Sequence, residues 1–451
     1  MKQIKALILS AGKGTRMKST LPKVVHKVCG KEMVNHVINA SREAGANEIV
    51  AILGHGSDIV EKVLPENTTI ALQVEQLGTG HAVMMAKDYI NDNDTIVVLC
   101  GDTPLIKPET LQNLFEYHTS NEYHTTVLTT SVENPTGYGR IIRDNNQNLL
   151  KIVEQKDASE EEKTVNEINS GIYCFNGASL RNALDRINNN NAQGEYYLTD
   201  TIEIMRNDGL KVGAFNGAKI NELMGVNSRV ELSKAEEIMR KRINEAHMVN
   251  GVTIIDTNST YIESDVEIGN DTIVYPGVML KGNSKIGNNC IIEMNSSIEN
   301  STIGDNTEIK NSIIVNSTIG ENTTVGPYAY LRPKSNIGNN VKIGDFVEVK
   351  NTTIGDNSKA SHLSYIGDAE VGKNVNIGCG VVFVNYDGKN KFKSIIKDNA
   401  FIGSNSNLVA PVTVEEKGYI ATGSTITEDV PEKALAIARE RQTNKLGWNN
   451  K

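Results

Sequence analysis

Hydrophobic and polar positions follow two different patterns along this chain, and the change occurs near residue 228. Before it, short apolar runs alternate with segments whose apolar residues recur at helical spacing. This alternation predicts a mostly parallel, doubly wound α/β sheet of the Rossmann-like type over residues 1–228. The predicted strands are KALILSA, EIVAILG, TIALQVE and TIVVLCGD, and the predicted helices are MVNHVINASREAG and TGHAVMMAKDYI.

A charged segment over residues 229–250 has its apolar residues on one stripe and ends before Gly251. It predicts a helix that links two domains.

From residue 251 to residue 451 an aliphatic residue followed by glycine recurs, often at spacings of six or a multiple of six. A hexapeptide period is typical of a parallel β-helix, in which one aliphatic side chain per repeat fills the interior. The aliphatic residues of these pairs are Ile268, Ile286, Ile303, Ile319, Val325, Ile337, Ile343, Ile354, Ile366, Val371, Ile377 and Ile402.

The repeat is interrupted between Ile377 and Ile402, where the segment VNYDGKNKFK lies. An insertion in a regular solenoid predicts a protruding loop, and loops on rigid scaffolds often carry function. Near the end the repeat gives way to a short helical or irregular tail.

Composition narrows the possible partners. A net charge of −9 argues against nucleic acid and against a membrane surface, both of which need a basic face. The five cysteines contain no CxxC pair and no apolar run reaches the roughly 20 residues of a membrane span. We therefore expect a cytoplasmic protein with unpaired thiols.

The stretch ALILSAGKGTRMKSTLPK, residues 6–23, ends an apolar run in a loop rich in glycine and cations. It departs from both the Walker A loop and the Rossmann glycine fingerprint at Met17. Backbone amides beside Gly12 can bind phosphate oxygens, and Arg16 and Lys23 can offset charge that develops during transfer. The alternative is a tight turn with solvated cations.

Two oxygen-bearing side chains suggest a metal site. Asp102 follows a predicted strand in CGDTPLI, where a carboxylate beside a phosphate loop can hold Mg²⁺. Asn227 precedes the linking helix, so its side chain could cap that helix or bind the metal. For Asp102, too, helix capping is the alternative.

In the repeat half, Arg332 and Lys350 follow inward positions and are 18 residues apart (350 − 332), which is one coil of a three-sided helix. They should lie on one corner of neighbouring coils, about 4.8 Å apart. Like charges at that distance favour an anion between them, such as a phosphate, unless both are simply solvated. His362 should point outward near a corner, either solvated or as a general base.

Several segments together resemble the sugar-nucleotide pyrophosphorylases, and with the hexapeptide half they resemble the bacterial bifunctional N-acetylglucosamine-1-phosphate uridylyltransferase/glucosamine-1-phosphate N-acetyltransferase family. The resemblance covers essentially the whole chain. The segments are LILSAGKGTRMKSTLPK, QVEQLGTGHA, CGDTPLI, NPTGYGRI, VEQKDA, NSGIYCFNG and GVNSRVEL.

This resemblance implies an enzyme that acetylates glucosamine 1-phosphate with acetyl-CoA and then transfers uridylyl from UTP, with Mg²⁺, in the supply of peptidoglycan precursors. It implies that His362 is the general base of acetyl transfer, that Arg16 and Lys23 assist uridylyl transfer, and that Asp102 and Asn227 bind the metal. UTP and the sugar phosphate would contact Leu9, Ala11, Gly12, Lys23, Gln73, Gly78, Thr79, Gly139, Glu154, Asn169 and Asn227. The acetyl acceptor would contact Arg332, Lys350, Tyr365, Asn376 and Lys391, and acetyl-CoA would contact Cys379, Asn385, Tyr386, Ser404, Thr422 and Arg439.

Cys379 and Thr422 depart from the family, in which alanine is common at both positions, and we expect the activity to be retained. The family's left-handed β-helices form homotrimers with the acetyl site between subunits, which the resemblance implies here. Two alternatives remain: a single-activity nucleotidyltransferase with a regulatory hexapeptide domain, and a catalytically inactive binding protein. Arg332, Lys350 and His362 argue against the first, and the intact loop with Asp102 argues against the second.

Overall fold

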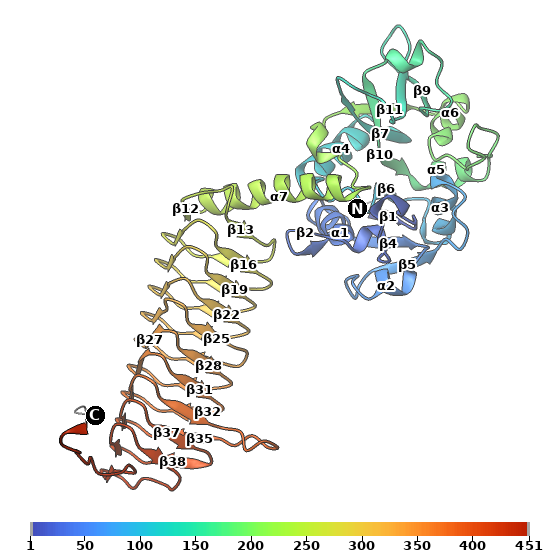
Figure 1. The fold of residues 1–451 in the computed structure, drawn as a ribbon. Helices are drawn as coiled ribbons and strands as arrows, with labels where there is room; N and C mark the ends of the chain where they lie inside the picture. The colour runs from blue at the N-terminus through green and yellow to red at the C-terminus, as the bar shows by residue number, and fades with distance from the viewer. Residues whose placement is uncertain (1–2, 449–451) are drawn as a thin grey trace. The chain divides into compact units, whose positions relative to one another are not determined.

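The computed structural model describes residues 3–448, and the chain forms two compact units, Met1–Met239 and Arg240–Lys451 (Figure 1). The division falls inside α7 (Arg229–Val249), a charged helix. Each unit has a hydrophobic interior of its own. Within residues 3–448 no helix combines the length and apolar character that crossing a bilayer demands.

The first unit is built on a nine-stranded sheet whose central path is β11-β7-β10-β6-β1-β4-β5. The strands at its centre pair in parallel, as the alternating pattern predicts, and their carboxyl ends lie at one edge. The strand bounds are β1 (Ile4–Ser10), β4 (Glu48–Leu53), β5 (Thr69–Leu72), β6 (Thr95–Cys100), β7 (Thr125–Ser131), β10 (Glu167–Asn176) and β11 (Val212–Asn216).

On the central path of the sheet, one strand departs from the parallel arrangement. β10 runs antiparallel to both β6 and β7, and it also pairs with the hairpin of β8 (Arg140–Arg143) and β9 (Leu149–Val153). The direction of a strand depends on the connection that precedes it, and the apolar pattern of the strand itself does not contain that information.

Helices cover both faces of this sheet, so its central strands are buried on both sides. One hydrophobic cluster includes Val37 and Leu114, and the other includes Val83, Leu180 and Ile202. The helices are α1 (Met33–Glu43), α2 (Ser57–Glu61), α3 (Thr79–Met85), α4 (Pro108–Ser120), α5 (Gly177–Leu184) and α6 (Asp200–Asn207).

The second unit is a left-handed parallel β-helix whose coils each contribute short strands to three sheets (Figure 1). The first sheet has 11 strands, from β12 (Thr253–Ile254) to β41 (Leu435–Ala436). The second has 10, from β13 (Tyr261–Ile262) to β40 (Thr425–Ile426), and the third has nine, from β14 (Glu267–Ile268) to β38 (Val412–Val414).

The interior of this solenoid is filled by the aliphatic residues of the hexapeptide pattern. Eleven of the 12 predicted positions are buried, and Ile268, near the first coil, is partly buried and packs against the same cluster. Parallel pairing stacks equivalent positions directly, as with Ile319, Ile337 and Ile354. Asparagines at one corner take positive φ, a backbone conformation that asparagine tolerates better than most residues. They are Asn289, Asn306, Asn322, Asn340, Asn357, Asn374 and Asn399.

The predicted insertion is a loop between β34 (Val382–Val384) and β35 (Ser394–Ile396), and it extends from the solenoid (Figure 1). Ala369 pairs with Ser394, 25 residues later (394 − 369), whereas Ile354 pairs with Val371 after 17 (371 − 354). A bridge between Tyr386 and Lys391 closes the loop. The coil therefore continues after the loop without a break in the sheets.

Candidate functional site

The first candidate site is a cavity of about 270 Å³ at the carboxyl ends of β1 and β6. Eight of the residues predicted to bind nucleotide or metal line it. They are Leu9, Ala11, Gly12, Lys23, Gln73, Gly78, Thr79 and Asp102. The lining also contains residues that sequence reasoning missed, namely Ser10, Val24, Gln76, Ala82, Cys100 and Glu195.

Lys23 is one of the charged residues that line this cavity. Its ammonium forms an ion pair with Asp102 and donates a hydrogen bond of 2.8 Å to the side-chain oxygen of Asn227. The oxygens of Asp102 and Asn227 therefore converge on one cation. A carboxylate and an amide oxygen are suitable ligands for Mg²⁺, which commonly takes its other ligands from water and substrate phosphates.

The cap of α7 is made by the residue after Asn227. The hydroxyl of Ser228 accepts a hydrogen bond of 3.3 Å from the backbone N–H of Glu231, and the Glu231 carboxylate accepts one of 2.7 Å from the N–H of Asn227. This is a variant of the capping box with Ser228 at the N-cap, in which the Glu231 carboxylate binds the N–H of the residue before the cap. The side chain of Asn227 is therefore not the cap, and its oxygen is directed to Lys23.

Glycine is required at two positions around the cavity. Gly14 has a φ of 60°, and a Cβ there would lie 2.6 Å from the Cβ of Lys23. Gly78 has a φ of 112°, and a Cβ there would lie 2.6 Å from the backbone oxygen of Tyr196.

Arg16, predicted to assist transfer, is exposed on the short 3₁₀ helix Thr15–Met17 and does not line the cavity.

The residues predicted to hold the sugar phosphate gather near this first cavity. A Cβ on Gly139 would lie 3.4 Å from a carboxylate oxygen of Glu154 and 3.4 Å from the Cβ of Asn169. Burial raises the pKa of Glu154, and nearby carboxylates, including that of Glu195 in the cavity wall, raise it further. Asn169 donates a hydrogen bond of 2.7 Å to the hydroxyl of Tyr173.

The thiol of Cys100 lines the cavity but is not a nucleophile. Burial raises the pKa of Cys100 to about 12, and the nearby carboxylate of Asp102 raises it as well. Nucleophilic catalysis by cysteine requires the thiolate, which is absent at neutral pH at such a pKa. The Cys100 thiol is therefore unsuited to act as a nucleophile at neutral pH.

The second candidate site is a cluster of cations on neighbouring coils of the solenoid. Tyr330 pairs with Glu348 and Leu331 pairs with Val349, which places Arg332 directly above Lys350, as the 18-residue spacing predicts. The neighbouring Lys350 ammonium lowers the pKa of Lys391, which lies in the protruding loop. Three cations thus come together from two coils and the loop.

Two cations of this cluster form ion pairs with carboxylates. The sequence analysis did not predict these carboxylates. Arg332 pairs with Glu348 at 2.8 Å, and Lys350 pairs with Asp368 at 3.4 Å. Burial alone would raise the pKa of Asp368, but hydrogen bonds from Asn351 and Asn385 and the charge of Lys350 lower it overall. Each of these two cations thus has a carboxylate partner of its own from the protein.

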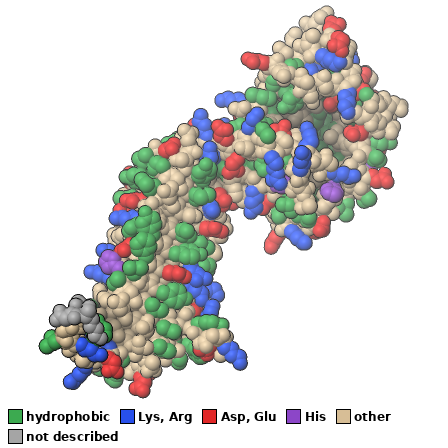
Figure 2. Space-filling model, viewed as in Figure 1, with side chains coloured by type: hydrophobic (Ala, Val, Ile, Leu, Met, Phe, Trp, Pro, Cys, Tyr) green, Lys and Arg blue, Asp and Glu red, His purple; other side chains and the backbone are tan. Residues whose placement is uncertain are grey.

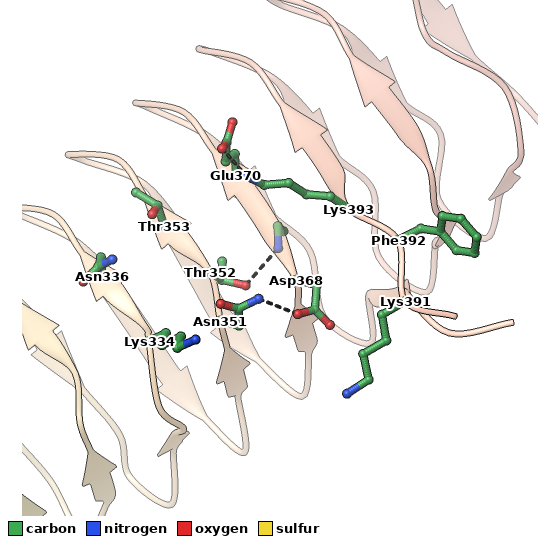
Figure 3. Close-up of a pocket in the computed structure, with 11 residues that line it drawn as sticks. Lys334, Asn336, Asn351, Thr352, Thr353, Asp368, Glu370, Lys391, Phe392 and Lys393 are labelled. Carbon is green, nitrogen blue, oxygen red and sulfur yellow. Dashed lines mark hydrogen bonds and ion pairs between the residues drawn. The ribbon is translucent and has the colours of Figure 1, made fainter. Parts of the chain in front are cut away.

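A cavity of about 670 Å³ lies beneath the protruding loop, next to the cation cluster (Figure 3). Asp368 and Lys391 line it, so the cavity and the cluster share residues. Figure 3 shows Asn351 hydrogen-bonded to Asp368, at 2.6 Å, and Lys393 extending from the loop to Glu370. Asp368 also accepts a hydrogen bond of 2.5 Å from Asn385 and so ties the loop to the coils.

A third group lies along one corner of the solenoid. His362 ends β30 (Lys359–His362) and pairs with Asp345 at the end of β27 (Lys342–Asp345). The His362 Nδ1 lies 2.5 Å from the Asp345 carboxylate, and the His362 side chain is 57% exposed, as predicted. Pairing of Ala360 with Ile377 places Cys379 at this same corner on the next coil.

The same corner continues through two further coils. Ile377 pairs with Ile402, and Ile402 pairs with Ile420, so Ser404 and Thr422 follow Cys379 in one column. Backbone hydrogen bonds of 2.7 Å to the oxygen of Cys379 and 2.8 Å to that of Ser404 hold consecutive coils together. Three residues predicted to contact acetyl-CoA therefore extend in a line from His362.

Two predicted residues lie elsewhere in the unit. Asn376 projects from β33 (Asn376–Ile377), stacked between Lys359 and Phe401, and so belongs to a different sheet from Arg332 and Lys350. Arg439 is exposed beyond β41. The remaining members lie near the cluster: Tyr386 is in the loop, and the Tyr365 hydroxyl accepts a hydrogen bond of 3.4 Å from Asn385.

Three of the polar residues that the sequence analysis missed have a notable position in the structure. The Ser10 hydroxyl is buried at the end of β1, and it has no hydrogen-bond partner within residues 3–448. Asp368 and Asp345 are the other two. Asp345 follows the aliphatic-glycine pair at Ile343, one coil before His362, and counting 17 residues along the repeat (362 − 345) would have found it.

Comparisons with known proteins find matches in both units of the chain. The nucleotidyl transferase family model matches residues 5–220, and the model of six bacterial transferase hexapeptide repeats matches residues 316–351. The solved structure of UDP-glucose pyrophosphorylase complexed with UDP-glucose is 18% identical, with a TM-score of 0.45, and covers 54% of this chain and 100% of its own.

Curated relatives match the chain from end to end. The bifunctional protein GlmU of Clostridioides difficile (strain 630) is 78% identical, over 99% of this chain and 97% of the relative. The bifunctional protein GlmU of Alkaliphilus metalliredigens (strain QYMF) is 57% identical, over 99% of this chain and 98% of the relative. Because identity this high extends over both units, the chain belongs to the family of bifunctional GlmU proteins.

Proposed function

We propose that this chain is a bifunctional enzyme of UDP-N-acetylglucosamine synthesis. The solenoid acetylates glucosamine 1-phosphate with acetyl-CoA, and the α/β unit then transfers uridylyl from UTP to N-acetylglucosamine 1-phosphate and releases pyrophosphate. The observation that carries this proposal is the presence of two separate polar sites in one chain: Lys23 with Asp102 and Asn227, and the cation cluster with His362.

In the α/β unit the cavity binds UTP with its phosphates against the loop that contains Gly12. Gln73 is suited to read the base, because its side chain is 3% exposed and held by a hydrogen bond of 3.1 Å to the backbone oxygen of Gly78. The sugar phosphate lies against Gly139, Glu154 and Asn169, which adjoin this cavity. The sugar phosphate oxygen attacks the α-phosphorus in line, and the protein contributes position and positive charge.

Asp102 and Asn227 would hold Mg²⁺, which when bound supplies positive charge to the phosphates. The donor set fits this role, because both oxygens already face a cation, the ammonium of Lys23. Within residues 3–448 no three His, Cys, Asp or Glu side chains gather as a metal site made by protein alone would. This supports a metal that shares its ligands with substrate phosphates. Lys23 would then be free to bind a phosphate oxygen.

In the solenoid the phosphate of glucosamine 1-phosphate binds among Arg332, Lys350 and Lys391, with Tyr365 beside them. His362 takes the proton from the amine as the amine attacks the thioester carbonyl. Acetyl-CoA extends along the corner column of Cys379, Ser404 and Thr422. A purely regulatory solenoid would not need this combination of cations and an exposed imidazole.

We further propose that the active form is a homotrimer in the cytoplasm, where UTP and acetyl-CoA are available. Asn376 supports shared sites, because it lies on a different sheet from Arg332 and Lys350 within one chain. Hydrophobic side chains reach the surface along the solenoid (Figure 2), among them Ile313, Tyr328 and Phe346. Burying such side chains between copies would favour assembly.

A paired assay tests this assignment. Acetyl transfer to glucosamine 1-phosphate and pyrophosphate release from UTP are measured in the wild type, Asp102→Ala and His362→Ala. We expect Asp102→Ala to lose only pyrophosphate release and His362→Ala to lose only acetyl transfer. Unchanged acetylation in His362→Ala, or loss of both activities in folded Asp102→Ala, would contradict the proposal.

A further inference from the structure

The carboxylate of Asp345 contacts the Nδ1 side of the His362 ring. Its carboxylate oxygen lies 2.5 Å from Nδ1, and the backbones of the two residues are paired in register between β27 and β30. The N–H of Leu363 donates a hydrogen bond of 2.9 Å to the backbone oxygen of Asp345 and closes the corner. Two adjacent coils therefore fix the carboxylate beside the ring.

Because Asp345 contacts Nδ1, the other ring nitrogen, Nε2, is left to accept a proton. A neutral imidazole has one N–H and one bare nitrogen, and a carboxylate at Nδ1 favours the tautomer with the proton on Nδ1. Nε2 is then the acceptor. The coils that flank His362 place two titratable residues at this corner, Asp345 on one side and Cys379 on the other. Of these two, Asp345 is the carboxylate.

We propose that Asp345 is a positioning residue for acetyl transfer, holding His362 with Nδ1 protonated and Nε2 free to accept the proton of the acceptor amine. The inference rests on the proposed function of the solenoid. As the amine nitrogen bonds to the thioester carbonyl carbon, its proton moves to Nε2. The C–S bond then breaks, and the coenzyme A thiolate leaves and takes the proton from the imidazolium.

The substitution Asp345→Asn distinguishes the effect of the hydrogen bond from the effect of the carboxylate charge. The asparagine side-chain oxygen can accept the same hydrogen bond from Nδ1–H, whereas alanine removes the partner altogether. Asp345→Ala should lower kcat for acetyl transfer by about tenfold to a hundredfold, less than the about 10²–10⁴-fold that a general base contributes. The KM for glucosamine 1-phosphate should change little, and Asp345→Asn should recover most of the rate.

The experiment measures kcat and KM for acetyl transfer in the wild type, Asp345→Ala, Asp345→Asn and His362→Ala. Asp356→Ala is the matched control, because Asp356 lies at another corner of the solenoid and pairs with Lys373. Nitrogen-15 NMR of labelled histidine reports the tautomer, and the His362→Ala spectrum identifies the signal. The rate of uridylyl transfer is measured in the same samples, and a normal rate shows that the variant chain is folded.

The supporting result is a loss of kcat in Asp345→Ala with a mixed tautomer, and near-normal rate and tautomer in Asp345→Asn. An unchanged kcat in Asp345→Ala overturns the inference, and so does an equal loss in Asp345→Asn, because charge would then be the contribution. If His362→Ala retains acetyl transfer, the proposed function of this site fails instead. The two failures are thus distinguishable.

Discussion

The ammonium of Lys23 lies 2.8 Å from the side-chain oxygen of Asn227, although 204 residues separate the two in the chain. The same ammonium forms an ion pair with Asp102. A cation thus occupies the point on which both proposed metal ligands converge. Metal binding and the release of Lys23 toward a phosphate are therefore expected to be one coupled event.

Lys23→Met tests this coupling. The substitution removes the ammonium, so Asp102 and Asn227 should bind Mn²⁺, used as a spectroscopic substitute for Mg²⁺, more tightly in the absence of nucleotide. Uridylyl transfer should nevertheless fall by about 10²–10³-fold, because a cation aimed at the developing charge is lost. Titration followed by electron paramagnetic resonance measures the affinity, and a pyrophosphate assay measures the rate.

Lys18→Met is the matched control for Lys23→Met, because Lys18 is an exposed lysine of the same loop and does not line the cavity. It should leave the Mn²⁺ affinity unchanged. Equal Mn²⁺ affinities in the wild type and Lys23→Met would show that the ammonium does not compete with the metal.

Thiol reagents should inactivate the two reactions selectively. Cys379 is exposed and shares its corner with His362 and Ser404, whereas burial raises the pKa of Cys100 to about 12 and also raises that of Cys174. N-ethylmaleimide should therefore block acetyl transfer before uridylyl transfer, and acetyl-CoA should protect. Cys379→Ala should resist the reagent and remain active, and rapid loss of its acetyl transfer under the same treatment would contradict the prediction.

The solenoid shows how much of this structure a sequence pattern can predict. The aliphatic-glycine pairs predicted the buried interior, and the 18-residue spacing correctly stacked Arg332 on Lys350. These predictions succeeded because each coil pairs with the next in a fixed register, so distance in space follows from distance in sequence. The same register places Asp345 17 residues before His362, on the preceding coil.

The α/β unit offers no such rule. Lys23, Asp102 and Asn227 meet because three separate connections return to one edge of the sheet, and no local pattern encodes those connections. The antiparallel direction of β10 was missed for the same reason. The cap of α7 was equally ambiguous, because Asn227 and Ser228 are both common cap residues and only the contact with Glu231 distinguishes them.

Asp368→Asn should weaken the link between the loop and the coils. Hydrogen bonds to a charged group contribute about 1.5–3 kcal/mol each, so the Tm should fall by several degrees at neutral pH. The KM for glucosamine 1-phosphate should rise, because Lys350 and Asn385 lose the carboxylate charge that they share. Thermal unfolding and acetyl transfer kinetics measure the two effects.

The difference in Tm between Asp368→Asn and the wild type should depend on pH. The pKa of Asp368 is lowered below its usual 3.8 in the folded chain. Its contribution to stability is therefore complete above the unfolded pKa and is lost as the pH falls through the folded value. The Tm difference should be constant at neutral pH and shrink below a pH of about 4; a difference that persists in strong acid would exclude the carboxylate charge as its origin.

Shared acetyl sites predict complementation between two inactive variants. Arg332→Ala removes a cation from one sheet, and Asn376→Ala removes an amide from another, so each alone should lose acetyl transfer. If one copy supplies Arg332 and a neighbour supplies Asn376, mixed oligomers regain intact sites. Random mixing in equal amounts should restore about a quarter of the wild-type sites, since each contribution is intact half the time.

The complementation assay refolds or co-expresses the two variants and compares acetyl transfer with that of each variant alone. Uridylyl transfer, measured in the same samples, normalises for the amount of folded chain. If each chain completed its own site, no mixture could contain an intact one, and activity would stay at the level of the single variants. Recovery in the mixture therefore requires that Arg332 and Asn376 act across two copies, which also explains why one chain keeps them on separate sheets.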